Sequence, residues 1–316
     1  MKIDKYLEEC LDVYESGVVE LVKNNYKKQE RCNDIESRMV DILSSGYTYS
    51  FNDITEVFYK EVKEKNWQRV NDFLYQDMLY HLMPGCHHGY DQCIHFHWAL
   101  SAYACGAEHV IERIFPREIG LSTYGYPYMV VGTNLFMAMY YKDEILLEQA
   151  VVGATHFVNK KTTKKWEKAV IQFVLDILHK DMAAANMSLQ EVCKGYLRCN
   201  DNYLRYSMED VNVPAYGIYF LARNYLSEED FAQIEMPEHK TISTGYVQWR
   251  LEHPTPELKV YITYPKEMDV LNKIYTLPVA KVSLEEHQES PWSPVRMIED
   301  VDKRYWDFVE ELKKLT

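Results

Sequence analysis

Residues 128–158, YMVVGTNLFMAMYYKDEILLEQAVVGATHFV, contain the pattern that decides the fold. Apolar side chains fall on every side of residues 128–141, which predicts a helix that is buried by neighbours all round. The charged turn Lys142-Asp143-Glu144 follows, and residues 143–158 have a single apolar face, which predicts an amphipathic helix. Because so short a turn makes consecutive helices antiparallel neighbours, this stretch predicts a helical hairpin.

Helical patterns extend from this hairpin in both directions. Residues 163–180 form another amphipathic helix, and residues 92–115 are apolar on every side, which predicts one long buried helix. Further helical spacing or start signals occur at residues 3–21, at Asp53, at residues 67–81, and at Ser188, Pro214, Ser227 and Ser293-Pro294. Helix pairs recur on the scale of a solenoid, without a fixed-period consensus.

The C-terminal part of the chain has a different composition. Seven of the eleven prolines follow residue 234, and apolar residues alternate with others over residues 258–264, which indicates a short strand or extended segment. We expect an all-α, multi-helical antiparallel array of solenoid-like helix pairs with a loop-rich, short-stranded C-terminal elaboration. Its parts are a helical body, residues 1–234, and a proline-rich elaboration with a closing helix, residues 235–316, packed on the same core.

Charge and composition restrict the partners of the chain. The net charge of -13 disfavours nucleic acid and anionic membranes and would steer basic partners toward the protein. The same acidity could serve solubility alone. The 26 tyrosines indicate wet grooves, helix crossings or an interaction face, because a buried tyrosine must place its hydroxyl on a partner.

Localisation is expected to be cytoplasmic. The opening residues MKIDKYLEEC do not resemble a signal peptide, and no stretch is apolar for the roughly 18 residues that a membrane helix needs. The seven scattered cysteines include no Cys-x-x-Cys pair, which favours reduced thiols.

Residues 86–97 are the chemically richest segment. Cys86, His88, Cys93 and His97 form a conceivable tetrahedral zinc site, although their spacing matches no established zinc motif. The alternative is a histidine-rich loop that runs into a buried helix. We favour this alternative and expect no cofactor.

Other catalytic signatures are absent from the sequence. It contains no Glu-x-x-His pair for a di-iron site, no phosphate-binding loop and no nucleophile elbow. Cys105, beside Gly106, is expected to be a core cysteine. The lysines of residues 160–168 are expected to be a solvated helix start with Trp166 turned inward. These observations favour a protein that is not an enzyme and does not bind nucleic acid.

Acidic residues beside tyrosines form the candidate partner-binding surface. Such a composition suits a basic, arginine-bearing partner, since tyrosine rings and carboxylates both attract guanidinium groups. Ordinary helix caps and solvated faces would explain each acidic cluster equally well. The candidate residues are Asp201, Tyr203, Tyr206, Glu209, Asp210, Glu228 and Glu229.

Several blocks together resemble a known family. They are His97-Trp98-Ala99-Leu100, Glu108 to Pro116, Tyr126-Pro127-Tyr128, Lys142 to Ala150, and Pro214 to Ala222. In content and order they resemble the helical immunity proteins of bacterial polymorphic toxin systems, most closely the immunity protein 49 type. The resemblance implies an all-α protein without catalysis that binds and neutralises a cognate toxin.

Three functional hypotheses follow. The first is toxin neutralisation by tight binding to a toxin with a basic face. The second is a helical-repeat scaffold for another protein partner. The third is a metal-binding enzyme that uses the segment from Cys86 to His97.

Overall fold

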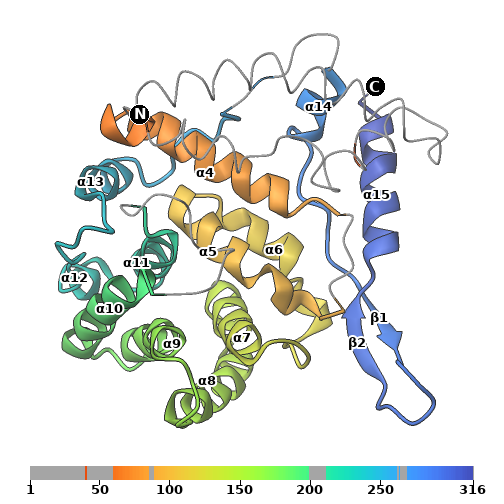
Figure 1. Cartoon of the computed structure of the whole chain (residues 1–316), viewed down its shortest axis with the longest axis horizontal. Coiled ribbons are helices and arrows are strands. Elements are labelled where there is room, and N and C mark those ends of the chain that lie inside the picture. The colour runs from red at the N-terminus through yellow and green to blue at the C-terminus, as the bar shows by residue number, and fades with distance from the viewer. Residues whose placement is uncertain are drawn as a thin grey trace. The chain divides into compact units, whose positions relative to one another are not determined.

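The computed structural model describes residue 40 and residues 60–84, 89–198, 211–261, 263 and 269–315. These residues belong to two compact units that alternate along the chain (Figure 1). Unit 1 comprises Met1–His87, Glu257–Ala280 and Asp300–Thr316, and unit 2 comprises His88–Pro256 and Lys281–Glu299. The division of the chain at residue 234 remains a prediction. The chain passes from one compact unit to the other between residues 87 and 88, 256 and 257, 280 and 281, and 299 and 300.

Unit 1 is helical in its described part. Its labelled helices are α4 (Trp67–His81), α14 (Asp269–Ile274) and α15 (Val301–Lys313), and residues 60–63 before α4 are also helical. The buried Arg304 of α15 donates hydrogen bonds to the carbonyl oxygens of Leu82, at 2.6 Å, and Ala280, at 3.1 Å. Because these bonds satisfy two carbonyls beside buried apolar residues, Arg304 joins the ends of three separate chain segments.

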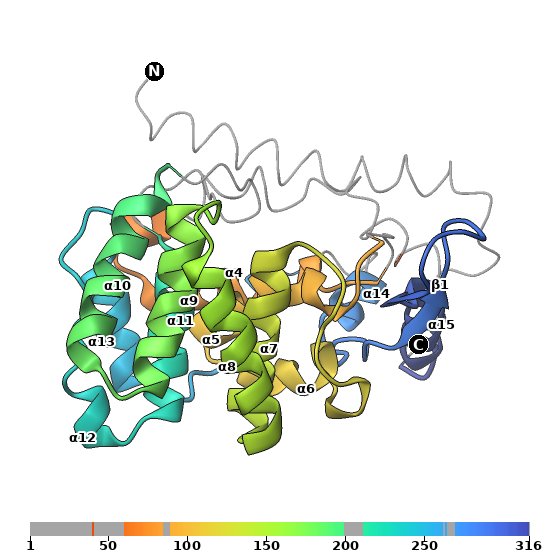
Figure 2. The ribbon, with the colours of Figure 1, turned by 90° about the horizontal axis from the view of Figure 1, so that it is seen from below.

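Unit 2 contains the remaining elements. Its helices are η1 (Gln92–His95), α5 (Phe96–Cys105), η2 (Glu108–Val110), α6 (Ile111–Ile114), η3 (Arg117–Ile119), α7 (Pro127–Tyr141), α8 (Glu144–Asn159), α9 (Lys165–Leu178), α10 (Met182–Tyr196), α11 (Val213–Tyr225), α12 (Glu228–Phe231) and α13 (Thr244–Glu252). Strands β1 (Leu284–His287) and β2 (Arg296–Glu299) form an antiparallel hairpin. Helices α7 to α10 pack each against the next in sequence order, and α11 packs against α5, α9 and α10 (Figure 2).

One type of helix ending recurs along the chain. Lys65, Gly106, Lys142 and Lys180 each end a helix with positive φ, between 50° and 83°. In every case the next residue donates its backbone N–H to the carbonyl five positions earlier, at 2.8–3.2 Å. This bond closes a Schellman-type helix ending. The four endings are 41, 36 and 38 residues apart. The structure therefore has a loose repeat of helix pairs, although the sequence has no fixed-period consensus.

The turn after each of two endings starts the next helix at once. Asp143 accepts hydrogen bonds from the backbone N–H groups of Ile145 and Leu146, and Asp181 accepts one from Ala184. Each aspartate thereby satisfies N–H groups that the first turn of a helix leaves without a partner. The dipeptide Lys-Asp therefore builds both the α7–α8 corner and the α9–α10 corner.

The core of unit 2 requires close approach of α11 to α5. A Cβ atom on Gly217 of α11 would lie 2.5 Å from the backbone oxygen of Leu100 in α5. Tyr246 and the buried Arg250 of α13 donate to the carbonyl oxygen of Ala104, near the end of α5. Helix α5 is therefore covered on several sides, as its all-apolar sequence predicts.

The predicted fold class is confirmed: the described chain is mostly helical, with one small strand pair near the C-terminus. The hairpin at 128–158 is confirmed as α7 and α8, and residues 163–180 contain α9. Helix starts at Pro214 and Ser227 are confirmed by α11 and α12. The patterns at residues 3–21 and at Asp53 lie outside the described residues.

Three local predictions are wrong. Residues 92–115 are not one helix, because Gly106 adopts φ 83° and ends α5 against Pro256. Ser188 does not begin a helix; it lies within α10, where its hydroxyl donates to Asp176 at 2.7 Å. Ser293-Pro294 lies in the hairpin turn, and the closing helix begins only at Val301, after the cap residue Asp300.

The pattern over residues 258–264 predicts a short strand or an extended segment, and only the strand alternative is wrong. The described residues among 258–264 form no strand, and Tyr261 instead packs its ring on Phe73 and on the guanidinium of Arg69. The strands occur at 284–287 and 296–299. An alternating pattern shows only that successive side chains face opposite sides, which an extended segment without a strand partner also does.

Candidate functional site

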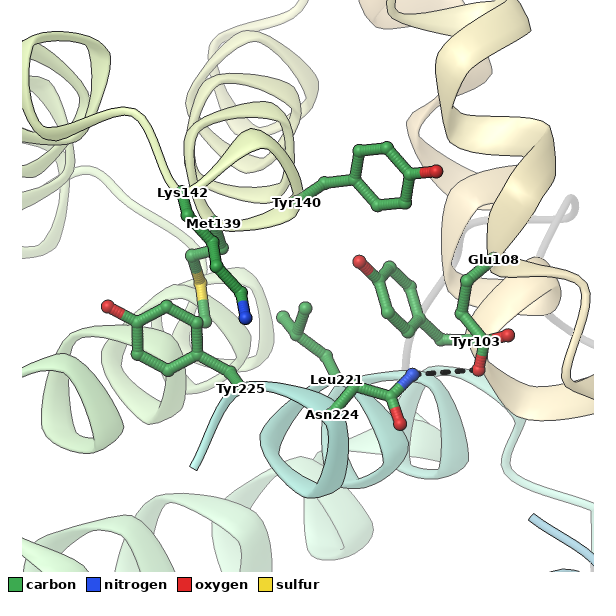
Figure 3. Close-up of a pocket in the computed structure, with 8 residues that line it drawn as sticks. All are labelled: Tyr103, Glu108, Met139, Tyr140, Lys142, Leu221, Asn224 and Tyr225. Atoms are coloured by element: carbon green, nitrogen blue, oxygen red, sulfur yellow. Dashed lines mark hydrogen bonds between the residues drawn. The ribbon is translucent and has the colours of Figure 1, made fainter. Parts of the chain in front are cut away.

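A pocket lies among the described residues of unit 2 (Figure 3). Its volume is about 180 Å³. It is lined by Tyr103, Glu108, Met139, Tyr140, Lys142, Leu221, Asn224 and Tyr225. We call it the tyrosine pocket. It forms where the final turns of α5, α7 and α11 meet the start of η2.

The helix endings position these side chains. Tyr103 lies in the last turn of α5, directly before the Gly106 ending that redirects the chain to Glu108. Tyr140 lies in the last turn of α7, and Lys142 is the left-handed residue that ends it. Asn224, near the end of α11, donates a hydrogen bond to Glu108 at 2.9 Å and so joins α11 to η2.

Two tyrosines of the pocket, Tyr103 and Tyr140, remain protonated at neutral pH. Burial, followed by the charge of Glu108, raises the pKa of Tyr103 far above its usual value. Burial and a hydrogen bond to Glu112 do the same to the pKa of Tyr140, whose hydroxyl donates to that carboxylate at 3.0 Å. Neutral phenols bind by hydrogen bonding and through their ring faces, so the pocket is suited to binding rather than to phenolate chemistry.

Several groups at the pocket attract a cation. Glu108 lines the pocket, Glu112 accepts a hydrogen bond from the lining residue Tyr140, and the last turns of α7 and α11 carry the negative ends of helix dipoles. The corresponding end of α5 is already occupied, because Arg250 binds its Ala104 carbonyl. Electron-rich tyrosine faces add to the attraction for a guanidinium or ammonium group.

Lys142 is the resident cation. Its side chain is exposed, extends from the end of α7 toward α11 (Figure 3), and makes no ion pair with another described residue. An unpaired lysine on a flexible stem can leave the pocket when a competing cation enters. The pocket therefore has a built-in competitor for the guest that it favours.

Large apolar side chains are exposed on α8, the helix that follows the pocket residue Lys142. Ile145 follows Lys142 at the start of α8 and is 71% exposed, and Val152 of the same helix is 67% exposed. Seven residues separate them, which places both on one face of the helix. Met187 of α10, the second helix of the next pair, is 70% exposed. These three side chains of α8 and α10 are available for contact with a partner.

The partner-binding residues expected from the sequence are only partly described. Asp201, Tyr203, Tyr206, Glu209 and Asp210 lie outside the described residues. Glu228 and Glu229 are exposed on α12, which directly follows the end of α11 that contributes Tyr225 to the pocket. A role for any of these seven residues in partner binding remains a prediction.

The zinc hypothesis also remains a prediction, because Cys86 and His88 lie outside the described residues. Cys93 and His97 are buried. Burial raises the pKa of the Cys93 thiol, whose sulfur lies 3.6 Å from the carbonyl oxygen of Tyr124. The described part of the chain contains no cluster of three or more metal-ligating side chains.

Two further sequence expectations are met. Cys105 is a buried core cysteine whose thiol pKa is raised by burial to about 12. Trp166 is turned inward beneath the exposed lysines of residues 160–168. Among the described residues, no helix has the length and apolar character to cross a membrane.

Sequence analysis missed the tyrosine pocket itself. Tyr103, Tyr140 and Tyr225 come from three helices that are distant in sequence, and no local spacing connects them. Comparison of the chain with family models, curated proteins and solved structures found no match.

Proposed function

We propose that this chain is a non-catalytic binding protein that neutralises a bacterial toxin, with a basic side chain of the toxin held in the tyrosine pocket. The observation that carries the proposal is a pocket of about 180 Å³ that is lined by Glu108 and by three tyrosine side chains. Carboxylates and tyrosine faces together recognise arginine and lysine at protein interfaces.

The surroundings of the pocket support recognition of a protein rather than a free small molecule. Ile145 and Val152 are exposed on one face of α8, the helix that follows Lys142 of the pocket. A partner that inserted one basic side chain could cover this face at the same time. The net charge of -13 would also accelerate the encounter with a basic partner.

The toxin as partner is suggested by the resemblance of the helical blocks to immunity proteins. Such a protein needs a large binding surface and no chemistry of its own. The second helix of each pair, with Ile145, Val152 and Met187 exposed, offers such a surface.

The test is co-expression with the protein that is encoded beside the gene for this chain. We expect growth of bacteria that are otherwise killed by that protein, and a stable complex on size exclusion. Its association rate constant should fall at least tenfold between low salt and about 0.5 M salt, because screening removes long-range attraction. Unchanged lethality and absence of a complex would reject the proposal.

A general helical-repeat scaffold is the second candidate. The repeated helix endings at Gly106, Lys142 and Lys180 favour it, since stacked helix pairs form extended binding surfaces. Formation of a complex with a non-toxic protein through the α8 face, together with no effect on toxin lethality, would favour the scaffold over the immunity function.

A further inference from the structure

The hairpin of β1 and β2 presents a large apolar side chain to solvent. Its turn, residues 288–295, extends beyond the two strands (Figure 1). Trp292 in this turn is 95% exposed, and Val295 and Met297 are also exposed. Fully exposed tryptophan is costly in water and is the side chain most enriched at the energetic centres of protein interfaces.

The base of the hairpin is fixed to the rest of unit 2. Glu299 donates its backbone N–H to the carbonyl oxygen of Tyr90 at 2.9 Å. Its carboxylate lies 2.9 Å from Nε2 of His95, and both side chains are buried. The guanidinium of Arg296 stacks on the ring of Tyr124, 4.2 Å from its centroid. These contacts restrain β2 directly and β1 through its pairing with β2.

The turn that holds Trp292 is also ordered by its own contacts. The hydroxyls of Ser290 and Ser293 lie 2.8 Å apart, and Gln288 donates to the carbonyl oxygen of Ser293 at 2.8 Å. Pro291 and Pro294 limit the backbone on either side of the tryptophan. A side chain presented by a restrained turn loses less entropy when a partner covers it.

Three glutamates lie in β1 and in the turn that follows it. Glu285, Glu286 and Glu289 are exposed and form no ion pair with another described residue. Glu286 stands directly opposite Met297 in the strand pair, so an acidic and an apolar side chain share one face. A second copy of this chain would bring like charges together, whereas a basic partner would neutralise them.

We propose that Leu284–Glu299 is a docking arm, and that Trp292 enters an apolar recess of a partner protein whose rim carries lysine or arginine. The inference rests on the proposed protein-binding function and adds a surface that is distinct from the tyrosine pocket. The arm supplies the apolar anchor and the three glutamates select the basic rim.

The first experiment uses the whole chain and two defined probes. These are an amphipathic peptide of leucine and lysine, and the same peptide with glutamate in place of lysine. Tryptophan fluorescence is recorded for the unaltered protein and for Trp292→Phe, and the difference isolates Trp292 from the other five tryptophans. We expect the cationic peptide to shift the Trp292 emission to shorter wavelength and the anionic peptide to have no effect.

The second experiment uses the complex with the neighbouring gene product. Trp292→Ser should weaken the complex at least tenfold, as expected for loss of an interface anchor. The control Trp306→Ser changes another exposed tryptophan, on α15, and should leave the affinity unchanged. If the complex forms equally well with Trp292→Ser, the arm proposal is rejected while the proposed function stands.

Other outcomes would overturn parts of the arm proposal. An equal emission shift with both peptides, or no shift with either, overturns the selection of a basic partner. Concentration-dependent dimers in sedimentation velocity that disappear with Trp292→Ser would assign the arm to self-association instead. If the neighbouring gene product does not bind, the peptide experiment alone tests the arm.

Discussion

Glu108 and Lys142 have opposite effects on a cation that enters the tyrosine pocket. Glu108 has one oxygen bonded to Asn224 and lines the pocket, whereas Lys142 places a competing charge there. We expect Glu108→Gln to weaken partner binding about tenfold, roughly 1.4 kcal/mol, and Lys142→Ala to strengthen it. Isothermal titration with the co-expressed partner measures both changes.

The matched control for this prediction is Glu118→Gln, which removes an exposed carboxylate that pairs with Lys281. It should alter the affinity little, since exposed ion pairs contribute at most about 1 kcal/mol. If Glu108→Gln and Glu118→Gln have equal effects, general acidity rather than the pocket controls binding.

The protonation state of His239 is expected to affect the stability of the protein. Burial, followed by the charges of Lys240 and Lys194, lowers its pKa below the ordinary value of 6.5. Its Nδ1 accepts a hydrogen bond from the backbone N–H of Thr241, whose carbonyl accepts one from Asn212 at the start of α11. The neutral imidazole therefore supports the cap of this helix.

The pKa of His239 is lower in the folded protein than in the unfolded chain. Its contribution to the free energy of unfolding is therefore fully present above pH 6.5, and it is lost as the pH falls through the pKa of the folded protein. Unfolding by urea at pH 7.5 and pH 5 should show this loss. His239→Asn retains an acceptor and should lose less stability on acidification. An identical loss in both proteins would contradict the assignment.

At the scale of elements, the helix endings explain both the successes and the failures of sequence analysis. Helical spacing located α7, α8 and α9 because each buries one face or all faces in a regular pattern. The same spacing predicted one helix in place of α5 and α6, because apolar residues continue across Gly106. The left-handed backbone conformation of Gly106 ends α5 there. The Lys-Asp pairs at residues 142 and 180 were the available local signal for the repeated corner.

The same endings allow a stability prediction. Lys65 adopts φ 57°, a conformation that costs a side-chain-bearing residue roughly 1 kcal/mol and costs glycine almost nothing. We expect Lys65→Gly to raise the free energy of unfolding by about 0.5–1 kcal/mol, as measured by urea unfolding. Lys160→Gly is the control, because Lys160 has negative φ and gains nothing from glycine.

Gly106→Ala should have the opposite effect. Its φ of 83° disfavours alanine, and a Cβ atom there would lie 2.7 Å from the ring of Pro256. We expect a loss of about 2 kcal/mol or more, which combines backbone strain with overpacking. A stability equal to that of the unaltered protein would show that the corner can relax.

At the scale of the whole molecule, the sequence was sufficient to predict the fold class but not to predict the tyrosine pocket. Burial patterns are local, so they could predict helices from neighbouring residues. The tyrosine pocket depends on how α5, α7 and α11 end in relation to one another, which no single segment encodes. The β-hairpin was not predicted, because Ser293-Pro294 is equally suited to a helix start and to a turn.

Unit 1 depends on its last segment. Arg304 of α15 binds the carbonyl that follows α4 and the one at Ala280. Deletion of residues 300–316 should therefore increase hydrogen exchange in α4 and α14 and leave the amides of α7 to α10 protected, as measured by mass spectrometry. Equal loss of protection in all these helices would mean that the two units unfold together.

The alternation of units along the chain has a consequence during translation. Helix α4 leaves the ribosome early, yet Arg304, which binds the carbonyl at its end, is synthesised more than 200 residues later. At elongation rates of about 5–20 residues per second, α4 must wait ten seconds or more for that contact. The helix pairs of unit 2 can pack during this interval, and α4 would be a nascent-chain segment exposed to chaperones until synthesis is complete.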